Sequence, residues 1–293
     1  MPRKKGLYRL EKEFFKKPTT YVGEVNINVT DLDKSLPFYQ EIIGFSILEQ
    51  TDRKAVLTAD GKTPLLTLEE PENVLPKEGR TTGLFHVAIL RPSRADLSSF
   101  LRHVAKAGVQ LGASDHLVSE ALYLNDPDGN GIEVYRDRPS NEWNWSNGQV
   151  AMSTEPLDAN SLLAESDHEW EGLPKATVMG HIHLHVANLQ NTETFYVDGL
   201  GFQIVTNYPG ALFASTGNYH HHIGLNIWNG ENAPAPAENS AGLNWYSLIF
   251  PDEKSREEKV KNLERAGASN KKETDAYIVK DPSENKIHLL LAD

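Results

Sequence analysis

Histidine and carboxylate side chains are the groups in this sequence that could hold a metal ion. The chain of 293 residues has 11 His and 41 Asp plus Glu but no Cys, so any metal must be bound through nitrogen and oxygen. His181, His183 and His185 alternate along one apolar run and should share one face of a strand. Two His and one carboxylate on one face form the common iron(II) site of oxygenases, which leaves positions for substrate and O₂.

A candidate carboxylate follows the turn-rich stretch DPDGNG at residues 126–131. Asp-Pro and Gly-rich sequences favour turns, and the apolar residues that follow predict a final strand. Glu133 lies between Ile132 and Val134, so its carboxylate is out of phase with an otherwise apolar strand. This placement favours a ligand; the alternative is a hairpin whose Glu133 faces solvent.

Internal repeats indicate the elements that would carry these residues. Residues 24–45 align with residues 181–202 without gaps, and residues 86–108 align less closely with residues 245–267. Each repeat reads as an alternating strand followed by an amphipathic helix. A gapless match of this length disfavours the alternative, a single α+β domain with accidental similarity.

The repeats predict an α+β fold of four units, each a strand, a helix and about three further strands. The predicted boundaries place two units in residues 1–137, a connector at 138–178 with a short helix near Leu162, and two units in 179–293. The four units themselves run over residues 20–71, 83–137, 179–229 and 241–292.

Composition excludes several classes of function. The formal net charge is −12, whereas binding to nucleic acid or to an anionic membrane surface needs a positive surface. The one basic cluster, Arg3, Lys4 and Lys5, should be a solvated arm. No apolar run approaches the about 18 residues of a membrane span, and the N-terminus lacks a signal-peptide stretch. We expect a soluble cytoplasmic protein, and the sequence leaves a homo-oligomer open.

The repeat pattern resembles that of the vicinal-oxygen-chelate superfamily, which includes glyoxalases, fosfomycin-resistance proteins and type I extradiol dioxygenases. Within it, the stretch from His116 to Glu133 resembles the extradiol dioxygenase signature. The match comprises a His, an apolar residue followed by Tyr123, Asp-Pro-x-Gly and a Glu, and it departs only slightly at Ser114. In this superfamily two βαβββ modules pair, and their curved sheets enclose a metal. The resemblance covers nearly the whole chain after residue 20 and is closest to bacterial catechol 2,3-dioxygenase-like enzymes.

The resemblance also implies roles for residues. In the family the Glu of this motif ligates iron, and its His and Tyr lie beside the substrate, which carries over to Glu133, His116 and Tyr123. The His ligands come from the first strands of paired modules. Of the four first-strand positions, only two are His in this chain, so the implied metal site is His86, His181 and Glu133.

The pairing of units follows from these ligands. Familiar extradiol enzymes pair the first unit with the second and the third with the fourth, with iron in the C-terminal pair. Here the fourth unit has Trp245 and His288 where the family has His and Glu. We therefore predict that the second and third units pair around the metal and that the first and fourth pair separately. Taken singly, His86 or His181 could instead be a hydrogen-bonded interior His.

A further cluster, YHHH at residues 219–222, resembles the family's His-His stretch, in which one His acts as acid and base near the substrate. The register favours His222, whereas a slip of one residue would select His221. A surface or adventitious metal-binding feature is the alternative. His183 and His185 would line the pocket, although a chelate of His181 with His183 stays open.

These features predict an extradiol ring-cleaving dioxygenase that inserts O₂ into a catechol-type or hydroquinone-type diol at a non-haem Fe(II) centre, with Mn(II) as the alternative metal. Tyr123 and His116 would orient or ionise the diol, and its partners would be the small aromatic diol and O₂. Two rivals use the same fold. A glyoxalase-like lyase or isomerase usually needs a second carboxylate ligand and a glutathione pocket, and a non-catalytic binding protein needs no intact triad.

Overall fold

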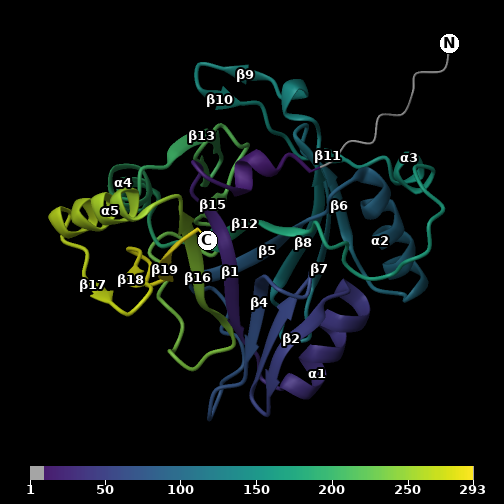
Figure 1. Cartoon of the computed structure of the whole chain (residues 1–293), viewed down its shortest axis with the longest axis horizontal. Helices are drawn as coiled ribbons and strands as arrows, with labels where there is room; N and C mark the ends of the chain where they lie inside the picture. Colours follow the sequence, from purple (N-terminus) through teal and green to yellow (C-terminus); the bar gives the residue numbers. More distant parts are fainter. Residues whose placement is uncertain (1–9, 293) are drawn as a thin grey trace.

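The computed structural model describes residues 10–292, with strands at the centre of the molecule and the longer helices on the outside (Figure 1). The predicted basic arm at residues 3–5 lies outside the described residues. After a short 3-10 helix, η1 (Lys12–Phe15), the chain forms the first of four similar units. The α+β class that the repeats predict is confirmed.

The first two units lie in the N-terminal half. Unit one consists of β1 (Tyr21–Asn28), α1 (Leu32–Pro37), the π-helical η2 (Phe38–Ile43), β2 (Ser46–Thr51), β3 (Lys54–Thr58) and β4 (Pro64–Glu69). Unit two consists of β5 (Gly83–Leu90), α2 (Arg94–Lys106), β6 (Gly112–Asp115), β7 (Ser119–Asn125) and β8 (Gly131–Asp137).

The connector and the last two units follow. The connector contains η3 (Ser140–Glu142), β9 (Trp145–Ser146), β10 (Gln149–Val150), β11 (Glu155–Pro156) and α3 (Ala159–Leu163). Unit three consists of β12 (Val178–His185), α4 (Leu189–Thr194), η4 (Phe195–Gly199), β13 (Gln203–Tyr208), β14 (Ala211–Ser215) and β15 (Ile223–Asn226). Unit four consists of β16 (Gly242–Phe250), α5 (Glu253–Arg265), β17 (Asn270–Lys272), β18 (Tyr277–Lys280) and β19 (Lys286–Leu291).

Each unit begins its helix in the same way. A polar side chain just before the helix accepts a hydrogen bond from the backbone N–H three residues later, which satisfies one of the unpaired donors at a helix start. The four capping residues are Asp31, Ser93, Asn188 and Asp252. The recurrence of this cap explains why the strand-to-helix transition falls at the same place in every unit.

Two sheets divide the four units between them. An eight-stranded sheet joins units one and four in the order β17-β18-β19-β16-β1-β4-β3-β2, and we call it the 1–4 sheet. A nine-stranded sheet, the 2–3 sheet, has the order β11-β6-β7-β8-β5-β12-β15-β14-β13. In each sheet the first strands of the two units lie side by side and antiparallel, β1 with β16 and β5 with β12.

Repeated Tyr and Asp residues tie the two sheets together. The buried Tyr39 of unit one donates a hydrogen bond to Asp126 of unit two over 2.9 Å. At the equivalent place, Tyr196 of unit three donates to Asp281 of unit four over 3.1 Å. Units that are consecutive in sequence therefore meet through their helices and turns, while their strands belong to different sheets.

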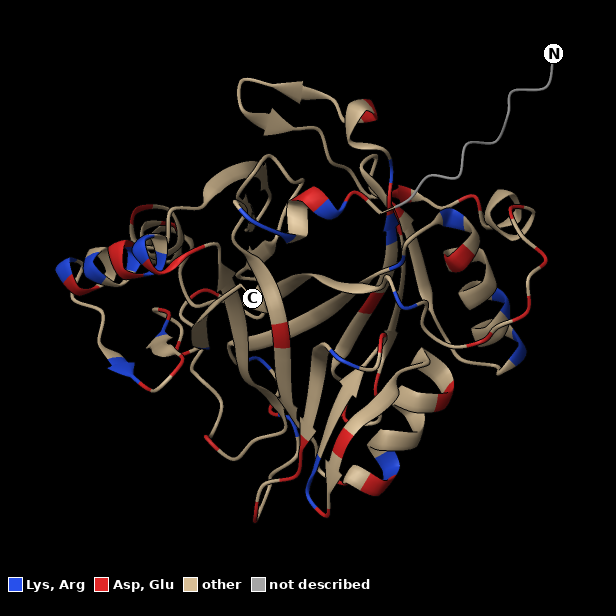
Figure 2. Cartoon of the chain, in the orientation of Figure 1, with Lys and Arg blue, Asp and Glu red and all other residues tan. Residues whose placement is uncertain are grey.

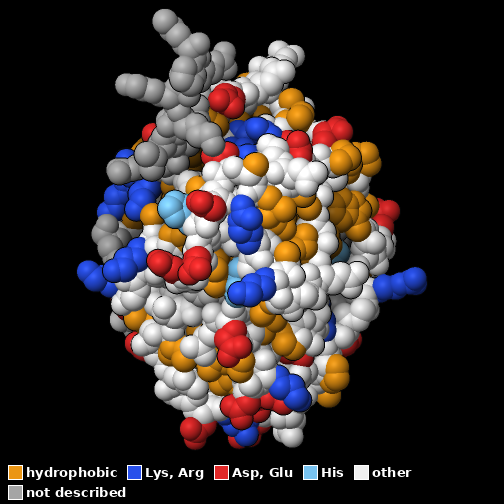
Figure 3. All heavy atoms as spheres, turned by 90° about the vertical axis from the view of Figure 1, so that its right-hand side faces the viewer, with side chains coloured by type: hydrophobic (Ala, Val, Ile, Leu, Met, Phe, Trp, Pro, Cys, Tyr) orange, Lys and Arg blue, Asp and Glu red, His pale blue; other side chains and the backbone are white. Residues whose placement is uncertain are grey.

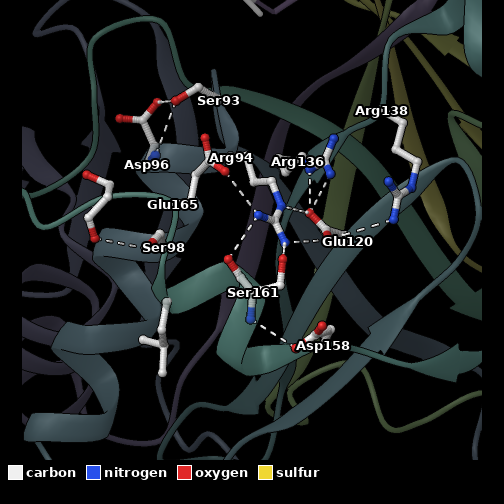
Figure 4. A network of polar contacts seen from close by, with 12 residues as sticks. Ser93, Arg94, Asp96, Ser98, Glu120, Arg136, Arg138, Asp158, Ser161 and Glu165 are labelled. Atoms are coloured by element: carbon white, nitrogen blue, oxygen red, sulfur yellow. Dashed lines mark hydrogen bonds and ion pairs between the residues drawn. The ribbon is translucent and has the colours of Figure 1, made fainter. Parts of the chain in front are cut away.

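The connector is held against unit two by a partly buried ionic network (Figure 4). Arg94 at the start of α2 donates to Glu120 over 2.8 Å, to the Ser161 carbonyl over 3.1 Å and to Glu165 over 3.1 Å. Arg136 also donates to Glu120, over 2.7 Å. The α3 helix and the loops beside it are thus fixed on the helical side of the 2–3 sheet.

Charged residues lie mainly on helices and loops at the periphery, and few lie on the central strands (Figure 2). On the face shown in Figure 3, acidic and basic side chains are interspersed, with apolar side chains between them. Within residues 10–292, no helix is long and apolar enough to cross a membrane.

Candidate metal centre

Three strands of the 2–3 sheet bring the candidate ligands together around Ala88. In the antiparallel pair of β5 with β12, Ala88 lies opposite His181, and His86 lies opposite His183. In the parallel pair of β5 with β8, Ala88 lies opposite Glu133. His86 is two residues from Ala88 on β5, so all three side chains leave the same face of the sheet. The small side chain of Ala88 leaves the space between them open.

The three side chains converge on one carboxylate oxygen. Glu133 Oε2 lies 3.0 Å from His86 Nε2 and 3.2 Å from His181 Nε2, and one ligand atom from each residue lies within 4.8 Å of the others. All three are buried, with exposed fractions of 6 % for His86, 3 % for Glu133 and 1 % for His181.

These separations fit a shared metal ion. Nitrogen and oxygen ligands bind first-row metals at about 2.0–2.2 Å, so two ligands at right angles are separated by about 3 Å. His86 Nε2 also makes no well-directed hydrogen bond, although it is buried and close to Glu133. A buried nitrogen that is aimed at a carboxylate without a hydrogen bond is suited to a cation placed between them.

The protonation states also suit metal binding. Burial alone would raise the pKa of Glu133, but His181 and His86 hold the pKa of this carboxyl well below its usual range. Burial lowers the pKa of His181 to about 4, against the opposing effect of Glu133. Near neutral pH the set therefore offers a carboxylate and a neutral imidazole, which are the forms that bind metals.

A cavity of about 290 Å³ opens beside the three residues. This volume is near the lower end of the about 300–1,000 Å³ that small-molecule sites occupy. Its apolar wall is formed by Phe85, Met152, Tyr208, Phe213 and Trp228. Tyr208 and Trp228 are 42 % and 47 % exposed, so the aromatic wall extends to the surface of the molecule. The cavity suits a small, flat, largely apolar ligand.

His116 and Tyr123 form a hydrogen-bonded pair in this cavity. His116 Nδ1 lies 2.7 Å from the Ser153 carbonyl oxygen, which can only accept, so Nδ1 carries the proton. In neutral His116 the other nitrogen, Nε2, then accepts the Tyr123 hydroxyl over 2.7 Å. Burial, together with the Glu133 charge, raises the pKa of Tyr123 well above its usual value. Tyr123 is therefore a neutral phenol that donates to His116.

The turn that aims His116 is strained. Leu117 has φ +69° in the left-handed region, where a bulky L-residue costs about 1–3 kcal/mol. Its N–H is held by Asp115 Oδ1 over 2.9 Å, and its side chain is 47 % exposed. The backbone thus accepts an unfavourable conformation at the residue next to His116.

The prediction that His222 faces the metal ligands is wrong. His222 Nε2 donates to the Phe14 carbonyl over 3.0 Å, its Nδ1 lies 3.2 Å from the Ser215 hydroxyl, and its ring packs against Phe15. His221 instead lines the cavity, with its ring centroid 4.1 Å from that of His181. The segment precedes β15, so the alternation of faces inside that strand does not govern it, and His221 rather than His222 reaches the cavity.

His183 and His185 lie on either side of one amide. Asn226 Nδ2 donates to His183 Nε2 over 3.0 Å, and His185 Nδ1 donates to Asn226 Oδ1 over 2.7 Å. His183 lines the cavity, and its ring centroid is 5.0 Å from that of His86. With Nε2 engaged by Asn226, its ring is fixed as part of the wall, and His185 lies beyond it. Gly224 makes this possible, because a Cβ there would lie 2.7 Å from the His183 ring.

Several residues of the site carried no signal in the sequence. Met152 and Ser153 belong to the connector, which has no apolar periodicity, yet they close the cavity and orient His116. Phe85 and Phe213 alternate with residues of the apolar core and could not be separated from it by pattern alone. Asn226, at the end of β15, became visible only as the partner of two His residues.

Comparisons with known proteins agree with this fold. A model described as the Glyoxalase/Bleomycin resistance protein/Dioxygenase superfamily matches residues 21–134 and 178–289. The chain is 47 % identical over 268 residues to a protein of Bacillus subtilis (strain 168) named catechol-2,3-dioxygenase, and the match covers 90 % of this chain and 94 % of that protein.

Solved structures show the same architecture at low identity. A structure from Bacillus subtilis subsp. subtilis str. 168 superposes with a TM-score of 0.65 at 12 % identity, covering 94 % of this chain and 86 % of that one. Glyoxalase I from Zea mays superposes with a TM-score of 0.57 at 16 % identity, covering 92 % of both chains. At these identities the likeness establishes the fold alone.

Proposed function

The chain belongs to the Glyoxalase/Bleomycin resistance protein/Dioxygenase superfamily, and from this premise we propose that it is an extradiol dioxygenase that inserts O₂ into a catechol-type or hydroquinone-type aromatic diol. The observation that carries the proposal is the buried set of His86, Glu133 and His181 within 4.8 Å, opening into a small aromatic cavity. The relative that is 47 % identical over 90 % of the chain carries a name for this reaction.

The donor set fits a divalent metal, and we propose Fe(II), with Mn(II) as the alternative. Two neutral imidazoles and one carboxylate on one face are typical of iron(II) oxygenases. Bound iron(II) would supply positions for both diol oxygens and for O₂, and would allow electrons to pass between them. Three protein ligands from three strands of one sheet would leave the side toward the cavity for these small molecules.

Other side chains of the cavity would bind the substrate, orient it and transfer its protons. Phe85, Phe213 and Trp228 would hold the aromatic ring and exclude water from it. Tyr123, fixed by His116, would place its phenol beside one diol oxygen. His221 would accept a proton from the other hydroxyl and return it as the ring opens, as expected of a neutral imidazole in this position. Burial lowers the pKa of His221 well below its usual range, so it begins as the base.

The test is oxygen consumption by metal-loaded protein. Purified chain, loaded anaerobically with Fe(II) or with Mn(II), is mixed with catechol or a substituted catechol, and O₂ uptake and the ring-cleavage product are followed. We expect one O₂ consumed per diol and both atoms of ¹⁸O₂ in the product. Absence of O₂ uptake with catechols and hydroquinones in both metal-loaded forms would overturn the proposal.

A further inference from the structure

A row of hydrogen-bonded side chains leads from His221 away from the cavity. His221 Nδ1 lies 2.8 Å from His220 Nδ1, and His220 Nε2 lies 2.8 Å from Asp137 Oδ1. Both imidazoles are buried, with exposed fractions of 5 % for His221 and 0 % for His220. Asp137 ends β8, four residues after Glu133, and its side chain is 16 % exposed at the edge of a separate cavity.

The donor and the acceptor of each hydrogen bond in this row can be assigned by starting from Asp137. Asp137 Oδ2 receives the Tyr219 hydroxyl over 3.0 Å, and Tyr135 in turn donates to Tyr219 over 2.8 Å. A carboxylate only accepts, so His220 must carry its proton on Nε2. In the neutral form of the His220 ring, the lone pair then lies on Nδ1.

The same reasoning continues to His221. Two facing Nδ1 atoms can share a hydrogen bond only if one carries a proton and the other a lone pair. Because Nδ1 of His220 has the lone pair, Nδ1 of His221 carries the proton. A neutral imidazole has one N–H, so the lone pair of His221 lies on Nε2, the nitrogen on the opposite side of the ring from His220.

We propose that Asp137 and His220 are positioning residues that hold His221 in the tautomer with its lone pair on Nε2. This inference rests on the proposed function of His221 as the base. In that step the O–H bond of a diol hydroxyl breaks, an N–H bond forms at Nε2, and the substrate keeps the electron pair as an oxyanion. The other neutral tautomer carries a proton at Nε2 and cannot perform this step.

Packing around His220 holds its ring in the orientation that makes these hydrogen bonds. Its ring centroid lies 4.1 Å from that of Tyr219 and 5.1 Å from that of Trp143, so a ring flip, which would put Cδ2 in the place of Nδ1 and Cε1 in the place of Nε2, is obstructed. His116 and His183, which also line the cavity, cannot replace His221, because the Nε2 lone pair of His116 accepts the Tyr123 hydroxyl and that of His183 accepts the Asn226 amide. His221 is therefore the imidazole that this network leaves with a basic nitrogen.

The tautomers can be observed directly by ¹⁵N NMR of the imidazole nitrogens. The probe is the full chain loaded with Zn(II), whose closed d-shell keeps the spectra sharp, and the metal-free chain alongside it. We expect His221 to show a protonated Nδ1 and an unprotonated Nε2, and His220 the reverse. A protonated Nε2 on His221 in the wild-type chain would overturn the proposal without any variant and without any activity measurement.

Asp137→Asn tests the source of the tautomer, since an amide of the same size can donate as well as accept. We expect His221 to lose its single tautomer and turnover to fall by about 10²–10⁴-fold, as when a catalytic imidazole is held in the wrong tautomer. Metal content and KM should stay within about twofold. Unchanged ¹⁵N shifts in Asp137→Asn would overturn the proposal.

Tyr219→Phe is the matched control, because it removes one hydrogen bond to Asp137 and keeps the link to His220. We expect the wild-type tautomer of His221 and turnover within a few-fold of wild type. A loss as large as that of Asp137→Asn would mean that the hydrogen bond from Tyr219 to Asp137, and not the link from Asp137 to His220, governs turnover, which would overturn the proposal. If the wild-type chain shows the expected tautomers but consumes no O₂ with any diol, the dioxygenase proposal fails while the tautomer assignment stands.

Discussion

The two sheets of this protein are built in the same way, but they carry different side chains at the positions where the 2–3 sheet has its candidate metal ligands. In the 2–3 sheet, His86 lies opposite His183, and in the 1–4 sheet Trp245 lies opposite Asn26. The parallel strand pairs correspond as well. In the 2–3 sheet Glu133 lies opposite Ala88, and in the 1–4 sheet His288 lies opposite Ser247. By register, Trp245, His288 and Glu24 occupy the places of His86, Glu133 and His181.

The side chains of the 1–4 sheet satisfy one another. The rings of Trp245 and His288 stack with centroids 4.3 Å apart at 6°. Glu24 accepts the hydroxyl of Thr67, and burial raises the pKa of this carboxyl, against that hydrogen bond. In the 2–3 sheet the equivalent groups converge on one oxygen, and a buried nitrogen is left without a hydrogen bond. Backbone geometry alone therefore makes no metal site; the identity of three side chains decides it.

The largest expected effect comes from removing the carboxylate. Glu133→Ala should lower bound metal from about one ion per chain to nearly none and abolish O₂ uptake, because loss of even an outer-shell partner costs about 10–100-fold in metal affinity. Metal analysis after dialysis provides the measurement. His288→Ala, at the equivalent place in the 1–4 sheet, should retain wild-type metal content. Equal losses in the two variants would contradict the distinction between the sheets.

The next effect distinguishes two neighbouring imidazoles. His221→Ala should lower turnover by about 10²–10⁴-fold, the usual contribution of a general acid–base group, and keep its metal. His222→Ala should keep turnover within a few-fold, since His222 contacts the Phe14 carbonyl rather than the cavity. Steady-state kinetics with metal content measured on the same samples decide this. Metal release from His221→Ala would make His221 a ligand.

Much of the architecture could be predicted because repeats encode it. The family and the α+β fold that the gapless match between residues 24–45 and 181–202 predicted are confirmed. Periodic apolar positions and turn sequences report on strands and helices directly. The candidate ligands could be named because the family resemblance assigns ligands to first- and last-strand positions, where His86, His181 and Glu133 interrupt the apolar pattern.

The error at His222 has a physical cause. Alternation of faces holds only inside an extended strand, and β15 begins one residue later, at Ile223. The hydrogen-bond partner of His222, the Phe14 carbonyl, is 208 residues away in the sequence. No local sequence pattern predicts this contact. Ser153 is similar, because a backbone carbonyl in an aperiodic connector orients His116. Such contacts depend on tertiary packing and carry no signature in the sequence around them.

An intermediate effect would come from building the missing site. Trp245→His should complete a two-His, one-carboxylate set with Glu24 and His288, and raise metal binding toward two ions per chain. We expect the second ion to bind more weakly, because Glu24 is also engaged by Thr67. Titration of metal-free protein with Mn(II) or Zn(II) measures the stoichiometry. Adding Glu24→Gln to this variant should restore one ion, and an unchanged stoichiometry in Trp245→His would show that the sheets differ in more than side chains.

The smallest effect concerns stability against acid at His222, whose equivalent in the 1–4 sheet by register is the non-titrating Leu65. Burial lowers the pKa of His222 to about 3, against the opposing hydrogen bond to Phe14. Between this value and the unfolded pKa of about 6.5, the unfolded chain binds one more proton than the folded chain, so stability falls as the pH falls.

One such proton changes the free energy of unfolding by up to about 1.4 kcal/mol per pH unit. His222→Gln removes the titrating group and keeps an N–H for the Phe14 carbonyl, so between pH 6.5 and about 3 its metal-free form should lose stability less steeply than wild type. Urea unfolding at several pH values measures the slopes. The other His residues titrate in both proteins and cancel in the difference, so parallel slopes would mean that folded His222 already binds its proton.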